Sequence, residues 1–179
     1  MNNQNAQEFL KHLQMSNNLN TAVFVSESLD SYAEVTYTSD TTESNPIFSE
    51  GVFQVQDKKF VVVLEYIKDD SATGVNFAQI INNQRFHSNL NNLTAKEVLS
   101  VFGTIIKETQ RHINKHIPNY VFFETNEANK LRVYLKIFKR NAPKGYRIIE
   151  STNAVVLQKD SLDIGTTIKP KFVSKDKYK

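Results

Sequence analysis

Residues 59–67, KFVVVLEYI, are the stretch that most restricts what this chain can fold into. Apolar side chains occupy both alternating sets of positions, so a strand made from them is apolar on both faces. A strand of that kind belongs in the middle of a sheet that is covered on two sides. The exception is Glu65, which is either a buried base suited to proton transfer or a side chain that faces water at a strand edge.

Shorter segments on either side predict the rest of the sheet and its helices. Alternating, β-branched and aromatic positions indicate strands, and apolar residues at helical spacing indicate helices. The predicted strands are residues 32–38, 47–56, 59–67, 75–81, 119–124, 146–150 and 154–158, and the predicted helices are residues 6–15, 94–117 and about 127–140. The connection from strand 75–81 through the long helix to strand 119–124 predicts a parallel pair. We therefore expect an α+β fold with a mixed, mostly antiparallel sheet and helices on both faces.

The long helix has the clearest boundaries. Thr94 and Glu97 form a capping box, in which each side chain bonds the other residue's backbone N–H. Pro118 ends the helix. The apolar stripe between these limits consists of Val98, Phe102, Ile105, Ile106, Thr109 and Ile113.

Length and composition bound the class of protein. The chain has 179 residues, of which 40% are hydrophobic and 23% are charged, as expected for one globular domain. We predict a single domain over residues 1–165 and a basic tail over residues 166–179. The absence of cysteine excludes disulfides and thiolate chemistry. Without a long apolar run or a signal-like start, we expect a cytoplasmic protein, or a particle component assembled there, with no membrane partner.

Charge is distributed unevenly along the chain. Residues 27–50 hold six acids and no base, whereas residues 130–147 hold seven bases and no acid. The tail adds five lysines and one aspartate. Such a tail either makes weak contacts with nucleic-acid phosphates or is simply a solvated end.

The helix at about 127–140 combines apolar and basic residues. Its core stripe is expected at Ala128, Leu131, Leu135 and Phe138. Val133 and Ile137 lie nearly opposite, so either another element of the chain covers them or they contact a partner. The basic candidates for partner or nucleic-acid contact are Lys130, Arg132, Lys136, Lys139 and Arg140.

The last part of the chain resembles the GNAT family of N-acetyltransferases. The strand NYVFFE, the helix with Tyr134 and the strand beginning at Gly145-Tyr146 are similar to the end of that fold, with Asn126 or Asn129 at the family's Asn position. The long spacing from Tyr134 to Gly145 is closer to divergent phage-encoded relatives, in which an Arg stands where this chain has Lys130. The order of elements from residue 32 to residue 158 is compatible with the same family.

The resemblance implies acetyl-CoA as cofactor, Tyr134 as the proton donor to the departing thiolate, and Gln84, Arg85 and Asn129 as cofactor-binding residues. The family holds the pyrophosphate in a glycine-rich loop with bare backbone N–H groups. Here residues 82–98 read NNQRFHSNLNNLTAKEV, and no glycine follows before Gly103.

This departure favours a function without catalysis. The expected function is a phage-type structural or virion-associated protein that acts through protein partners or self-assembly, is assembled in the host cytoplasm and uses no cofactor. One alternative is an acetyl-CoA-dependent N-acyltransferase with Tyr134 and Glu65 as catalytic residues. The other is a nucleic-acid-binding module.

Two histidines near the end of the long helix form a candidate metal site. His112 and His116 lie one helical turn apart, which is a spacing that can bind a metal ion. No third ligand is evident, and imidazoles near a helix C-terminus are favoured by the helix dipole alone. The sequence therefore predicts no metal site.

Overall fold

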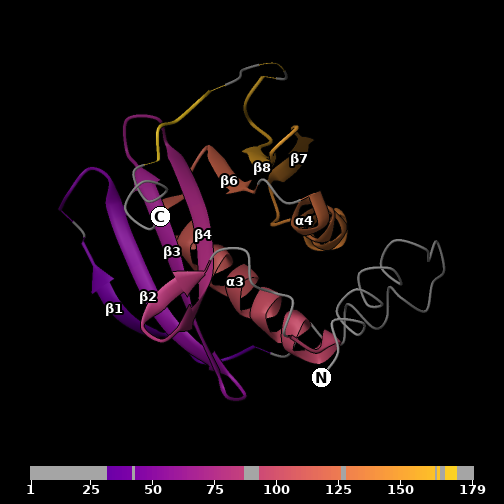
Figure 1. The fold of residues 1–179 in the computed structure, drawn as a ribbon. Helices are drawn as coiled ribbons and strands as arrows, with labels where there is room; N and C mark the ends of the chain where they lie inside the picture. Colours follow the sequence, from indigo (N-terminus) through magenta and orange to yellow (C-terminus); the bar gives the residue numbers. More distant parts are fainter. Residues whose placement is uncertain are drawn as a thin grey trace.

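The structure is a computed structural model that describes residues 32–41, 43–86, 93–125, 128–163, 165 and 168–172 (Figure 1). Its strands are β1 (Thr36–Asp40), β2 (Ile47–Val55), β3 (Lys58–Ile67), β4 (Ala72–Ile81), β5 (Gln84–Phe86), β6 (Tyr120–Glu124), β7 (Tyr146–Glu150) and β8 (Ala154–Lys159), and its helices are α3 (Ala95–His116) and α4 (Ala128–Asn141). The helix expected at residues 6–15 lies outside the described residues.

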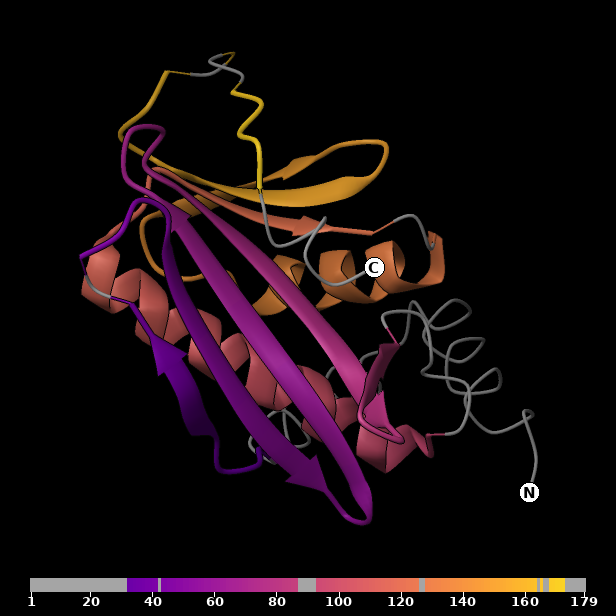
Figure 2. The same ribbon diagram turned by 60° about the vertical axis from the view of Figure 1, so that its left-hand side comes forward.

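The strands form one open sheet in the order β1-β2-β3-β4-β6-β8-β7, with β5 paired to β4. Every pair is antiparallel except β4 and β6. Because α3 connects these two strands, the predicted parallel crossover is confirmed, as is the mixed, mostly antiparallel sheet. The parallel pairing is short, joining residues 72–74 to residues 120–122. Beyond it the two strands separate, as Figure 2 shows.

The central position of β3 is also confirmed. Its residues from Phe60 to Glu65 are all buried, and it pairs along its length with β2 and β4. Val62 and Leu64 face the main core, whereas Val61 and Val63 belong to a separate cluster on the opposite face. Strict alternation therefore places Glu65 on that opposite face, where it is 0% exposed.

Both described helices cover the same face of the sheet, and because the helix expected at residues 6–15 lies outside the described residues, helices on both faces stay a prediction. The main core joins side chains of α3 and α4 to one face of β2, β3, β4, β6 and β8. α3 packs against β2 and β3, and α4 packs against β6, β7 and β8 (Figure 2).

Part of the opposite face is covered by residues 168–172. The Phe172 ring packs on Phe122, with ring centres 5.6 Å apart, and joins a small cluster with Ala72 and Tyr120. It also lies directly on Gly74, where an added Cβ would come within 2.7 Å of the ring. A side chain at position 74 would therefore displace the aromatic ring from the sheet.

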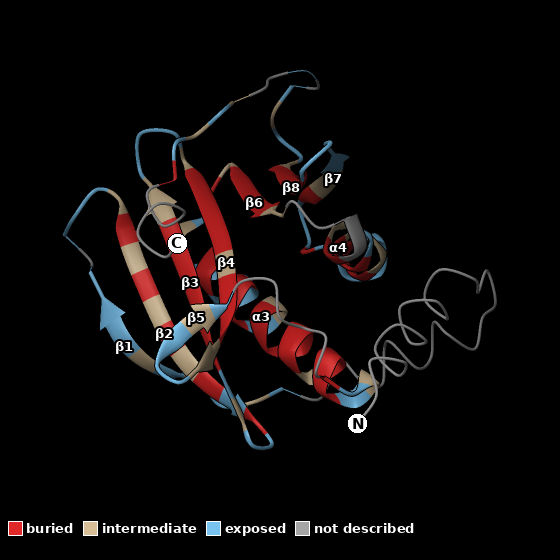
Figure 3. Cartoon of the chain, viewed as in Figure 1, coloured by how far each residue is buried: buried red, intermediate tan, exposed pale blue. Residues whose placement is uncertain are grey.

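α4 buries a different side from the one expected. Leu131 and Leu135 are only partly buried, although Phe138 is buried as predicted. The residues of its buried side are Lys130, Val133, Tyr134, Ile137 and Phe138. These positions have the spacing of one helical face. The hydrophobic pattern of the sequence did not show this face because one of its residues is a lysine. Figure 3 shows buried residues on the inner sides of both helices.

The burial of Val133 and Ile137 decides between coverage by the same chain and contact with a partner. They are 5% and 3% exposed and belong to the main core with residues of α3 and the sheet. Other elements of the same chain therefore cover them, and they offer no surface to a partner.

Candidate functional site

The structure does not bring the residues expected to be catalytic together. Tyr134 lies in the main core between the helices and the sheet, whereas Glu65 lies on the opposite face of β3. The sheet therefore separates the two side chains. General acid–base partners have to reach the same substrate atoms, which this arrangement does not allow.

Tyr134 stands at the centre of an aromatic cluster. Its ring centre is 5.1 Å from that of Phe123, 5.4 Å from Phe102 and 6.5 Å from Phe77. The Tyr134 and Phe102 planes meet nearly at right angles, as aromatic pairs prefer. With 2% of its surface exposed, Tyr134 stabilises the core as part of this aromatic cluster.

The predicted cofactor-binding residues are likewise dispersed. Arg85, on β5, holds Glu50 of β2 with two bonds, from Nη1 to Oε2 at 3.1 Å and from Nη2 to Oε1 at 2.8 Å. This paired geometry is the strongest that arginine makes with a carboxylate. Gln84 is exposed beside it, and the side chain of Asn129 lies outside the described residues.

The N-terminus of α3 is closed by the chain's own carboxylate. Glu97 Oε2 accepts a bond of 2.6 Å from the Thr94 backbone N–H, and the Thr94 hydroxyl accepts one of 3.3 Å from the Glu97 N–H. The predicted capping box is therefore confirmed. The other oxygen, Oε1, lies 2.7 Å from Lys58 Nζ, a partner that local sequence patterns did not reveal.

Electrostatics keep this carboxylate charged. Burial acts to raise the pKa of Glu97, but the bonds from Lys58 and Thr94 outweigh it and hold the pKa below its ordinary value. The hydrogen bond to Glu97 in turn raises the pKa of Lys58. A helix N-terminus attracts anions, and here an internal anion already occupies that position.

The outer side of α4 carries a basic surface, consisting of Arg132, Lys136, Lys139 and Arg140. Three of these residues are exposed, and Lys136 is half-buried. Burial lowers the pKa of Lys136, and the neighbouring Arg140 lowers it further. Lys139 bonds Glu150 of β7 at 2.7 Å. Lys130 does not belong to this surface, because it is buried with its Nζ 5.2 Å from the centre of the Phe77 ring.

The C-terminal end of α3 holds a second group of polar side chains. The rings of His112 and His116 are 4.5 Å apart, and the Tyr66 ring lies 4.9 Å from His116. His112 is 4% exposed, and burial lowers its pKa to about 3, with smaller contributions from His116 and Lys115. The Nε2 atoms of both histidines are buried without a hydrogen-bond partner.

The described residues contain neither a membrane-spanning helix nor a group of three metal-ligand side chains. No described helix is long and apolar enough to cross a membrane. Within the same part of the chain, no three histidine, aspartate or glutamate side chains are grouped closely enough to hold a metal ion. Comparisons with family models, curated proteins and solved structures found no match to this chain.

Proposed function

We propose that this chain is a non-catalytic structural protein with a GNAT-like fold, of the phage-type, virion-associated class, that acts through protein–protein assembly in the host cytoplasm. The observation that carries the proposal is the charged Glu97 carboxylate at the N-terminus of α3. A bound pyrophosphate at that helix end would face a buried negative charge held by Thr94 and Lys58. The position of Tyr134 among aromatic rings supports the same conclusion.

The GNAT-like part of the proposal is supported by the order of the elements. The long helix α3 connects the parallel strands β4 and β6, and α4 leads into the hairpin of β7 and β8. This is the order with which the resemblance is compatible. The order of elements supports the GNAT-like fold alone, because activity depends on the residues of a site and not on the fold.

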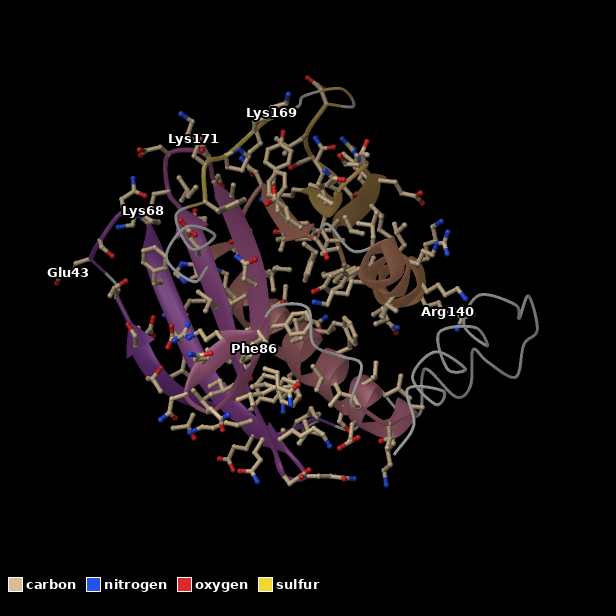
Figure 4. The ribbon with its side chains drawn as sticks, viewed as in Figure 1. Glu43, Lys68, Phe86, Arg140, Lys169 and Lys171 are labelled. Atoms are coloured by element: carbon tan, nitrogen blue, oxygen red, sulfur yellow. The ribbon has the colours of Figure 1, made fainter. Side chains whose placement is uncertain are left out.

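Opposite charges at two sides of the molecule support assembly. The α4 basic surface lies on one side, and an acidic edge at and near β1, consisting of Glu34, Asp40 and Glu43, is exposed on the other. Figure 4 shows Arg140 and Glu43 on opposite sides. Contacts of this kind between copies are head-to-tail, so they build rings or filaments.

Titration of the purified chain with acetyl-CoA tests the absence of catalysis. Isothermal calorimetry should give no saturable heat at millimolar ligand, since no open anion site is expected at α3. Saturable binding that disappears in Arg85→Ala would instead support the N-acyltransferase. Inorganic pyrophosphate serves as a second probe, because it isolates the phosphate contacts from those of the rest of the cofactor.

A charge exchange tests the assembly surfaces. Sedimentation velocity should show self-association that weakens with salt and is lost in Arg132→Glu/Arg140→Glu. Mixing this variant with Glu34→Arg/Glu43→Arg should restore association. The matched control is Lys169→Glu/Lys171→Glu, which makes the same charge change at two exposed positions elsewhere (Figure 4).

Two results would contradict the assembly proposal. One is a wild-type chain that stays monomeric at every concentration and salt. The other is association that the control variant weakens as much as the α4 variant does. A salt-dependent shift of DNA that the α4 variant abolishes would favour the nucleic-acid-binding alternative.

A further inference from the structure

Unpartnered polar atoms gather at the C-terminal end of α3. In the described part of the chain, four buried side-chain nitrogen or oxygen atoms lack a hydrogen-bond partner. Two are the Nε2 atoms of His112 and His116, and a third is the hydroxyl of Thr73. Each such atom costs stability unless something binds it, so the two neighbouring imidazole nitrogens point to a bound group.

Strand register places Thr73 opposite Tyr66, the tyrosine that both histidines contact. Thr73 of β4 lies directly opposite Tyr66 of β3, so their side chains share one face of the sheet. That face carries the main core, since Val75 and Leu64 belong to it. Tyr66 packs against both imidazoles, with ring centres 6.1 Å from His112 and 4.9 Å from His116. The two imidazoles therefore contact one tyrosine ring, and Thr73 is the cross-strand partner of that tyrosine.

The separation of the two imidazoles suits a shared metal ion. Two imidazoles that bind one ion through nitrogen at about 2 Å have ring centres about 4.5–5.2 Å apart, for angles of about 90–110° at the ion. The observed distance between the rings is 4.5 Å, with planes inclined by 44°. Imidazole nitrogen is a preferred ligand of zinc, copper and nickel, whereas magnesium and calcium prefer oxygen.

Charges of both signs lie around the pair. The site lies in the last turn of α3, where the helix dipole is negative. Asp40 favours positive charge at His116, whereas Lys115 and Lys68 oppose it. Lys115 opposes a cation, but its Nζ lies 3.3 Å from the Asp40 carboxylate, which partly neutralises it.

We propose that His112 and His116 bind one divalent transition-metal ion of the zinc class through their Nε2 atoms, with the Thr73 hydroxyl bonding a water on that ion. Two protein ligands leave the remaining coordination positions to water, in keeping with the absence of a third histidine or carboxylate ligand among the described residues. His112, His116 and Thr73 lie outside the proposed assembly surfaces, whereas the nearby Asp40 belongs to the acidic edge.

Metal titration of the full chain tests the proposal. The background carries His12→Ala and His87→Ala, so that the only imidazoles left are the proposed pair. After chelator treatment, Zn²⁺ titration by calorimetry should give one saturable site per chain, and Zn²⁺ should raise the melting temperature. Co²⁺ should give visible absorption bands of a nitrogen-ligated ion. The Nε2 resonances of both histidines should shift with Zn²⁺ in nitrogen-detected NMR.

Variants separate the site from adventitious binding. His116→Gln should abolish saturable binding and the Co²⁺ bands, and its partial exposure makes folding of the variant expected. Thr73→Val should weaken binding about tenfold, as outer contacts of metal ligands do. Asn114→Ala, an exposed change on the same helical turn, should have no effect. Absence of Zn²⁺ binding at millimolar concentration, or binding unchanged in His116→Gln, would overturn the proposal in favour of a buried water.

Discussion

The two ends of α3 solve the same physical problem in opposite ways. At the N-terminus, the buried Glu97 has a partner for each oxygen, the Thr94 backbone N–H and the Lys58 ammonium. At the C-terminus, His112 and His116 each keep a buried Nε2 without a partner. Both ends belong to one 22-residue helix packed on one sheet, so the difference lies in side chains rather than in architecture.

The comparison separates a structural end from a candidate binding end. A charge with all its partners inside the chain stabilises the fold and excludes an external ligand of the same sign. Buried groups without partners lower the stability of the free protein, and a ligand that binds them recovers that stability. Anions are therefore unexpected at the first end, and a cation is expected at the second.

The largest expected effect comes from removing Glu97, whose two carboxylate oxygens both have partners at the N-terminus of α3. Glu97→Ala removes the bond to the Thr94 N–H and leaves Lys58 without its buried partner, so the free energy of unfolding should fall by about 3 kcal/mol. Urea unfolding followed by circular dichroism measures it. Lys96→Ala, at an exposed position in the same turn, is the control and should change stability by less than about 0.5 kcal/mol. If Glu97→Ala lowers the free energy of unfolding no more than the control does, the contacts of Glu97 do not stabilise this end of α3.

A smaller effect comes from removing only the cation. Lys58→Met leaves a buried carboxylate held by Thr94 alone and should cost about 2 kcal/mol near neutral pH. The pKa of Glu97 is lower in the folded chain than its usual 4.5, so the stability it provides is present above that value and declines as pH falls through the folded pKa. The difference between wild type and Lys58→Met should therefore shrink below about pH 4.5.

Unfolding measured at several pH values from neutral to acid tests whether the stability difference between the two proteins shrinks as the pH falls. Asp40 also has a lowered pKa, so the wild-type curve alone mixes the two carboxylates. Subtracting the Lys58→Met curve removes the Asp40 contribution, because that residue is unchanged in both proteins. A difference that grows on acidification would contradict the assignment of the charged pair.

Features set by neighbouring residues were predictable from the sequence. The strands other than β5, the capping box of α3 and the parallel crossover follow from local periodicity, from Thr94 with Glu97 and from the order of elements. Their physical causes act over a few residues. Most of the fold was therefore predictable without coordinates.

Features set by distant residues were not predictable. Lys58 and Glu97 are 39 positions apart, and nothing local indicates that they meet. Which side of α4 is buried depends on the strands that the helix covers. The charged Lys130 belongs to that side, so the hydrophobic pattern did not indicate it. The position of Thr73 opposite Tyr66 is set by strand register, which a single sequence does not show. These long-range placements decide what the candidate site contains.

The smallest expected effect sharpens the comparison most, because the same chemical change is made at each end. Thr94→Val removes a hydroxyl that caps α3 and should destabilise the chain by about 1 kcal/mol. Thr73→Val removes a buried hydroxyl that has no partner, so in chelator-treated protein the change should be neutral or stabilising by about 1 kcal/mol. Urea unfolding of both variants with and without Zn²⁺ gives the comparison. Equal losses in the metal-free state would mean that Thr73 is as well bonded as Thr94, and the two ends of the helix would then not differ.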